Sequence, residues 1–159
     1  MSLFSQFNSL YRKSILAIAK IAVPVFAAGI VLGSAGTSMA SSTCSPYGYY
    51  GLIDGNQYYN QACIATVSSG ANATTWVGGN QSSTVPTGYM GGYARLYNAS
   101  GSLKEYAGWV FNNSPVYAMA VTTPTDGVHQ SYYSYGITAA YNGNGYNYIY
   151  TYQSPDLTY

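Results

Sequence analysis

The sequence contains very few charged residues: Lys, Arg, Asp and Glu together make up 6% of its 159 residues. Soluble domains usually carry about 25%. Three of the five basic residues lie before residue 40, so residues 41–159 keep two basic and four acidic side chains and a net charge of −2. A nucleic-acid-binding domain needs a basic surface, and we therefore expect no nucleic-acid partner. Solubility has to come from Ser, Thr, Asn, Gln and Tyr.

A surface with so few titratable groups should have a stability that depends little on pH. We therefore hypothesise that the protein works in an acidic or otherwise harsh exterior. The alternative is that low charge is an adaptation to packing against copies of the same chain, because low net charge favours association.

The sequence has only two cysteines and one histidine. Cys44 and Cys63 both follow the N-terminal segment, and thiols exported from the cell tend to oxidise. The pair therefore predicts a disulfide that closes a loop of about 20 residues and stabilises the fold by roughly 3 kcal/mol in the chain-entropy model. Because the spacing is far from CxxC and histidine is scarce, we expect no metal site and no cofactor.

Catalytic motifs are also lacking. His129 follows Asp126 by three residues, but no Gly-x-Ser-x-Gly elbow marks a nucleophile that would complete a triad. No recognisable motif of paired carboxylates contains any of the four acids, which are Asp54, Glu105, Asp126 and Asp156. We therefore expect a protein that is not an enzyme and has no catalytic residues.

Residues 1–40 have the layout of a secretory signal peptide. Basic residues at positions 12, 13 and 20 precede an apolar run over residues 21–32 and a stretch of small residues that ends at Ala40. We expect cleavage near Ser41, a secreted or cell-surface location, and no membrane contact afterwards. The alternative is a retained anchor, although Lys20 and Pro24 interrupt an apolar span that is already short for a membrane helix of about 20 residues.

Residues 41–159 predict one all-β domain. Gly and Asn recur between runs rich in Tyr, Thr, Val and Ile, and no window offers a helical face. We expect a small antiparallel β-sandwich in which residues 41–70 form a disulfide-closed segment rich in Tyr, Gly and Asn together with the first strand, and residues 71–159 form the rest. The expected strands, about seven, cover residues 61–68, 74–77, 89–97, 103–111, 116–123, 130–140 and 146–152.

Two hairpins are indicated by their turn residues. Asn98-Ala99-Ser100-Gly101 separates two strand-like runs, with Gly where a positive φ is needed. Asn142-Gly143-Asn144-Gly145 contains the Asn-Gly dipeptide twice, which is the strongest short hairpin signal. If Arg95 pairs with Glu105 across the first hairpin, the exposed ion pair contributes less than about 1 kcal/mol.

Tyrosine is the most unusual component, with 20 residues in the chain. Because strand side chains alternate between faces, the last hairpin predicts one continuous contact face composed of Tyr133, Tyr135, Tyr141, Tyr146, Tyr148, Tyr150 and Tyr152. The alternative is that these rings pack or cover the core. A second candidate is an aromatic loop inside the disulfide ring, with Tyr47, Tyr49, Tyr50, Tyr58 and Tyr59. This loop could bind a partner or cover an open end of the sandwich.

These features favour a secreted, non-catalytic structural protein that associates with itself in a surface layer, fibre or matrix. A tyrosine-lined face and an edge strand near the C-terminus both suit such contacts. One alternative is a carbohydrate-binding module for a cell-surface glycan, with tyrosines and Trp109 or Trp76 as stacking platforms. Another is a small secreted toxin against competing cells, although the basic amphipathic segment expected for membrane attack is missing.

Overall fold

The computed structural model describes residues 40–79 and 83–159. The predicted signal peptide lies outside the described residues, apart from Ala40. The described residues belong to one compact unit, which contains all the described strands. In the described ranges, no helix has the length and apolar character needed to cross a membrane.

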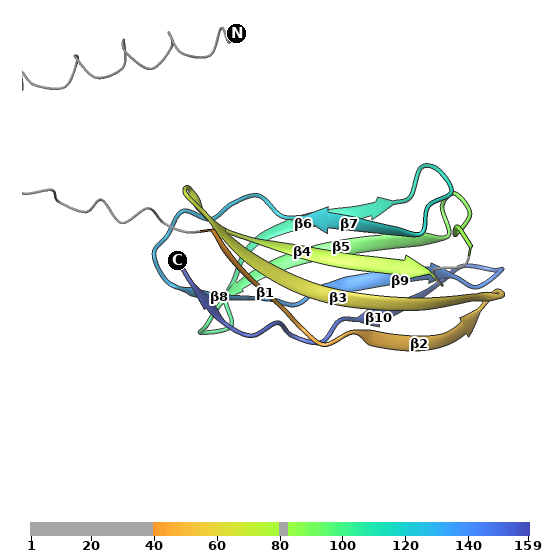
Figure 1. Ribbon diagram of the computed structural model, residues 1–159, viewed down its shortest axis with the longest axis horizontal. Helices are drawn as coiled ribbons and strands as arrows, with labels where there is room; N and C mark the ends of the chain where they lie inside the picture. The colour runs from red at the N-terminus through yellow and green to blue at the C-terminus, as the bar shows by residue number, and fades with distance from the viewer. Residues whose placement is uncertain (1–39, 80–82) are drawn as a thin grey trace, which may run out of the picture. The chain divides into compact units, whose positions relative to one another are not determined.

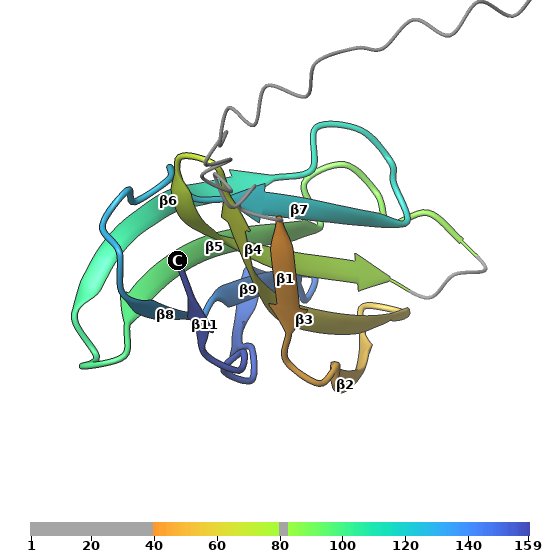
Figure 2. The same cartoon turned by 60° about the vertical axis from the view of Figure 1, so that its left-hand side comes forward.

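The described residues form eleven β-strands in two antiparallel sheets and no helix. The strands are β1 (Ser41–Cys44), β2 (Gly48–Ile53), β3 (Asn56–Val67), β4 (Gly70–Gly79), β5 (Met90–Asn98), β6 (Leu103–Phe111), β7 (Ala118–Thr122), β8 (Ser131–Ser134), β9 (Ile137–Tyr141), β10 (Tyr146–Tyr150) and β11 (Leu157–Thr158). Figure 1 and Figure 2 show that they lie in two layers.

The first sheet is centred on the long hairpin of β3 and β4. β7 flanks β4, while β1 and β2 pair one after the other with the opposite edge of β3. Alternate side chains of β3 are buried, among them Tyr58, Ala62 and Ile64. This period of two is what a strand with one face on the core requires.

The second sheet is centred on β5. β6 pairs with one edge of β5, and the other edge pairs with β9 along its first half and with β8 along its second half. β10 and β11 then pair with β9 and β8, respectively. The chain from β8 to β11 therefore forms one long, interrupted hairpin along this sheet.

The core lies between the two sheets. One buried cluster contains Tyr58 and Val77 from the first sheet and Met90 and Ala140 from the second, together with Val85. The other cluster contains Ile64, Ala71, Ala73, Leu96 and Tyr132. Because both clusters combine residues of both sheets, the sheets pack face to face, and burial of each large apolar side chain contributes about 1.5 to 3 kcal/mol.

The all-β, antiparallel prediction is confirmed, and so is the disulfide between Cys44 and Cys63, whose Cα atoms lie 4.0 Å apart. Both predicted hairpins are present, as β5–β6 and β9–β10. Gly101 in the first turn has the expected positive φ, 86°.

The expected number of about seven strands is wrong, for three reasons, one of which is the two-residue strand β11 (Leu157–Thr158), which lies beyond the last expected strand. Residues 41–53 form strands β1 and β2, and Asp54-Gly55, with φ angles of 47° and 75°, makes the turn into β3. The expected strand at residues 130–140 is divided into β8 and β9 around Tyr135 and Gly136. Gly136 faces the opposite sheet so closely that a Cβ there would collide with the Thr75 side chain.

The outer edges of both sheets are short or irregular. One edge of the first sheet is divided between β1 and β2, and the other is β7, with five residues. One edge of the second sheet is divided between β10 and β11. The remaining edge, β6, has nine residues, and its pairing with β5 shifts register at Gly92/Ala94 and again at Leu96/Tyr97.

Candidate contact surface and groove

The outward side of the second sheet is covered by aromatic rings. Alternation along β5 points Tyr93, Arg95 and Tyr97 outward, while Ala94 and Leu96 are buried. The register places further rings of the neighbouring strands on the same side. We call this surface the aromatic face; its rings are Tyr93, Tyr97, Tyr106, Trp109, Phe111, Tyr133, Tyr135, Tyr141, Tyr146, Tyr148 and Tyr150.

Trp109 lies at the centre of the aromatic face. Its ring centroid is 5.1 Å from that of Tyr148, 5.7 Å from that of Tyr93 and 5.9 Å from that of Phe111. These spacings are typical of favourable aromatic pairs, each worth about 0.5 to 1.5 kcal/mol beyond area burial. Tyr106 and Tyr148 nevertheless leave 57% and 58% of their surface exposed. The rings therefore hold one another in place and still present a wide surface to solvent.

Arg95 is a charged side chain that lies among the rings of the aromatic face. Its guanidinium carbon lies 5.3 to 5.6 Å from the ring centroids of Tyr97, Tyr135 and Tyr150. Its Nε donates a hydrogen bond to the carbonyl oxygen of Tyr135 at 3.0 Å. Nη2 is buried and has no hydrogen-bond partner among the described residues. The cation is thus covered by rings, an arrangement in which cation–π attraction is strong.

The register does not set Arg95 opposite Glu105. Arg95 pairs with Tyr106, and Glu105 pairs with Leu96. Because neighbouring residues of a strand point to opposite faces, Glu105 is directed away from the face that carries Arg95. The rings of the aromatic face, rather than a carboxylate, surround the guanidinium.

Six of the seven residues of the predicted contact face lie together on the aromatic face. Tyr152 does not, because β10 ends at Tyr150, and the next residue, Thr151, is buried with its backbone bonded to Gly136. The five rings of β5 and β6 were not predicted as members of this face. Two features of the sequence could have predicted them: the alternation of Tyr93, Arg95 and Tyr97 along β5, and the hairpin that places β6 beside β5.

The predicted aromatic loop is instead a pair of strands, because Tyr49 and Tyr50 lie in β2, and Tyr58 and Tyr59 lie in β3. Tyr47 precedes β2, and its ring packs with those of Tyr49 and Tyr59 on the outward side of the first sheet. Tyr58 is fully buried in the core. These five rings are therefore divided between the surface and the interior.

Tyr50 links the two sheets. Its ring stacks on Tyr58 with centroids 6.0 Å apart, and its hydroxyl lies 3.0 Å from Thr138 Oγ1 of β9. Burial raises the pKa of Tyr50 to about 12, although the hydrogen bond to Thr138 works in the opposite direction. Burial also raises the pKa of Tyr58 to about 12, with Asp54 as a further cause. Both phenols are therefore held in the neutral form.

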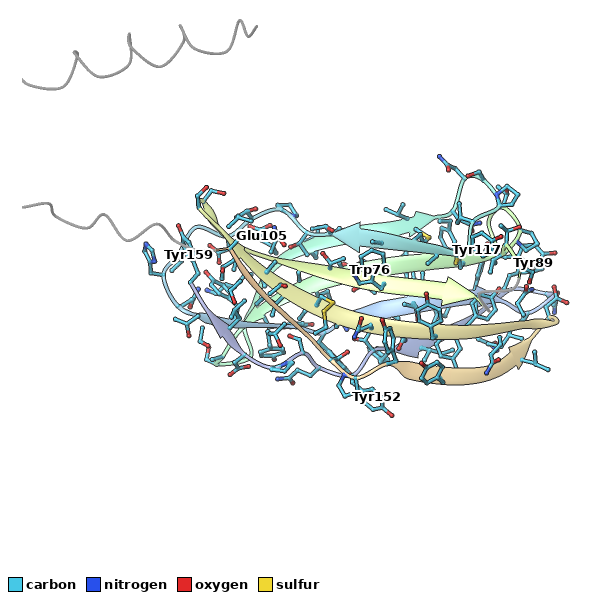
Figure 3. The ribbon with its side chains drawn as sticks, viewed as in Figure 1. Trp76, Tyr89, Glu105, Tyr117, Tyr152 and Tyr159 are labelled. Atoms are coloured by element: carbon cyan, nitrogen blue, oxygen red, sulfur yellow. A yellow bond between two sulfur atoms is a disulfide. The ribbon has the colours of Figure 1, made fainter. Side chains whose placement is uncertain are left out.

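A groove of about 400 Å³ lies between the edge strand β2 and the chain that follows β10. Its lining residues are Gly48, Tyr49, Tyr50, Asn60, Tyr135, Ile149, Tyr150, Thr151, Tyr152 and Gln153. Figure 3 shows Tyr152 at the lower edge of the molecule, whereas Tyr117 lies in the right-hand part of the upper strands. The groove thus brings together rings of the predicted face, rings of the predicted loop, and Tyr152.

Asn60 occupies the floor of the groove and is fully buried. Its Nδ2 donates to Thr138 Oγ1 at 3.0 Å and to the carbonyl oxygen of Tyr150 at 3.3 Å. Its Oδ1 has no hydrogen-bond partner among the described residues and lies against Gly48, where a Cβ would approach it to 2.5 Å. Unpartnered buried acceptors are rare, because each costs about 1 to 3 kcal/mol.

A second hollow, of about 360 Å³, lies on the outward side of the first sheet beside the disulfide. Trp76, Tyr47, Tyr59 and Gln61 line it together with Ala118 and the two cysteines. Trp76 is 42% exposed and lies near the middle of this sheet, as Figure 3 shows. Trp76 therefore lies on the other sheet from Trp109, so the two tryptophans cannot form one platform.

The residues considered for catalysis have local partners. The His129 ring stacks on Tyr159 at a centroid distance of 4.5 Å, and Asp126 Oδ1 accepts a hydrogen bond from the Val128 amide at 3.1 Å. No group of three or more His, Cys, Asp or Glu residues in the described part of the chain could hold a metal ion. The absence of catalytic activity stays a prediction.

Comparison of the chain with protein-family models, with curated proteins and with solved structures found no match in any of the three.

Proposed function

We propose that the protein is a non-catalytic structural component that works outside the cell and associates with its own copies through the aromatic face. The observation that carries this proposal is the continuous layer of eleven aromatic rings on the outward side of the second sheet, with Tyr106 and Tyr148 more than half exposed. Contiguous exposed apolar patches of this kind mark interaction surfaces on soluble proteins. The disulfide is compatible with an extracellular location.

Electrostatics support a copy of the same chain as the partner. Glu105, which neighbours Tyr106 in β6, is directed away from the aromatic face, and the Arg95 cation is covered by three rings. Two such faces can therefore approach each other without strong repulsion, and the net charge of −2 over residues 41–159 adds little more. A two-fold contact would bring each face onto its own copy. Tyr and Trp are the residue types that most often dominate binding energy at interfaces.

The proposal predicts reversible association of residues 41–159, the span that contains both sheets and the whole core. Sedimentation velocity and light scattering across a concentration series should show oligomers that increase with concentration. The variant Tyr106→Ser/Tyr148→Ser removes two exposed rings that pack on Tyr93 and Trp109. We expect its dissociation constant to rise at least about tenfold, since each interface hot spot contributes more than about 1 kcal/mol.

The matched control is Tyr49→Ser/Tyr117→Ser, which removes two tyrosines that are 71% and 54% exposed and lie outside the aromatic face. This variant should associate as the unchanged protein does. A protein that stays monomeric at millimolar concentration would contradict the proposal. So would equal weakening in the control, which would mean that general surface hydrophobicity, rather than this face, drives association.

A further inference from the structure

We propose that the groove between β2 and residues 150–153 binds a neutral, hydroxyl-rich ring, that is, one or two units of an uncharged saccharide. The groove is separate from the centre of the aromatic face, so this inference does not depend on self-association. Its volume of about 400 Å³ lies within the range of small-molecule sites, about 300 to 1,000 Å³.

Exposed aromatic rings form the walls of the groove. β2 contributes Tyr49, which is 71% exposed, and the chain at and after the end of β10 contributes Tyr150 and Tyr152, which are 56% and 60% exposed. Rigid rings of this kind provide large contact areas at a small entropic cost. They can pack against the C–H faces of a sugar ring while their hydroxyl groups remain hydrated.

The floor of the groove provides polar groups that a hydrocarbon ligand would leave unused. Asn60 is held by hydrogen bonds from Nδ2 to Thr138 and Tyr150, and Thr138 is itself bonded to Tyr50 and to the carbonyl oxygen of Ile149. This network fixes the carboxamide, while Oδ1 beside Gly48 has no donor among the residues that the structure describes. A ligand hydroxyl group that enters beside Gly48 would supply that donor and remove the cost of an unpartnered buried acceptor.

The charge of the lining determines the class of saccharide. None of the ten lining residues is charged. Arg95 contacts the rings of Tyr135 and Tyr150 but does not line the groove. An anionic ligand would lose hydration without gaining a charged partner, which is costly. The groove therefore favours neutral glycans over uronic-acid or sulfated glycans.

The test is a titration of ¹⁵N-labelled residues 41–159 with chitotetraose and cellotetraose as neutral probes and a hyaluronan tetrasaccharide as the anionic probe. We expect at least one neutral probe to shift the amide signals of Gly48, Thr151 and Gln153. The hyaluronan probe should leave them in place. The absence of shifts with both neutral probes at 10 mM, or stronger shifts with the anionic probe, would overturn the inference.

Two groove variants, each with a matched control, test what the walls and the floor of the groove contribute to binding of the neutral probe. Tyr49→Ala/Tyr152→Ala should weaken binding of the neutral probe at least about tenfold, whereas Tyr117→Ala should not change it.

Gly48→Ala directs a methyl group at Asn60 Oδ1 and should also weaken binding of the neutral probe. Gly51→Ala, on the same strand with open space around it, should not. Unchanged affinity in both groove variants would overturn the inference. The Tyr106→Ser/Tyr148→Ser variant should bind normally, so this result is independent of whether the chain self-associates.

Discussion

Gly136 lies where the chain between β8 and β9 comes close to Thr75 of the opposite sheet. We predict that Gly136→Ala lowers the free energy of unfolding by about 1 to 3 kcal/mol, because the added methyl group overpacks a tight contact with the Thr75 side chain. Gly108→Ala is the matched control, since nothing lies within 4 Å of a Cβ at that position. Urea unfolding of both variants checks the prediction. A midpoint for Gly136→Ala equal to that of the control would contradict it.

Among individual residues, six of the eleven rings of the aromatic face could be predicted from the sequence, whereas the groove could not. The alternation of side chains along β10 correctly predicted that Tyr146, Tyr148 and Tyr150 lie on one face of the sheet, because alternation is a local property of a strand. Asn60 gave no such signal, since its importance comes from Thr138, 78 residues away. Contacts between elements that are distant in the sequence are set by how the sheets pack, which local patterns do not encode.

Among the elements, β1 is a short edge strand whose four residues pair with β3. The disulfide joins Cys44 at the end of β1 to its direct register partner, Cys63. We predict that Cys44→Ser/Cys63→Ser lowers the free energy of unfolding by roughly 3 kcal/mol in the chain-entropy model, because the 19-residue separation is no longer cross-linked. Urea unfolding with and without reductant measures this. Reduction should destabilise the unchanged protein and leave the variant unaffected.

The strands near the N-terminus show where prediction of elements failed. Residues 41–53 lack a clear alternation and contain several Gly and Tyr residues, so they indicated a loop. The Asp54-Gly55 dipeptide was a usable hairpin signal, since both residues adopt positive φ. Pairing with β3, rather than intrinsic preference, makes β1 and β2 extended, and edge pairing of this kind depends on tertiary context.

For the molecule as a whole, we predict a free energy of unfolding that is nearly constant from pH 3 to pH 9 and falls between pH 10 and 12. Only six Asp, Glu, Lys and Arg side chains occur in residues 41–159, which limits the change on the acidic side. Burial raises the pKa of Tyr50 and Tyr58 to about 12. The folded state therefore holds these phenol protons more tightly than the unfolded state, so their stabilisation is complete below pH 10 and is lost above it.

Thermal unfolding across this pH range checks the profile, and Tyr50→Phe isolates one contributor. Tyr50 alone should account for a loss of roughly 2 to 3 kcal/mol between pH 10 and 12, which the variant removes. At pH 7 the variant should lose about 1 kcal/mol, because Thr138 loses its hydrogen bond to the hydroxyl. A large loss of stability at pH 3 would contradict the acid-tolerance hypothesis and leave packing between copies as the reason for the low charge.

The divided and irregular sheet edges have a consequence for the self-association that we propose. A regular, flat edge strand can template the addition of other chains and seed cross-β fibrils. Here one edge is divided between β1 and β2, and another is divided between β10 and β11. The third edge, β7, is short, and the pairing of the fourth, β6, has two register shifts. In the self-association that we propose, copies of this chain would pack through their aromatic faces, and the divided, short or irregular edges would disfavour amyloid growth.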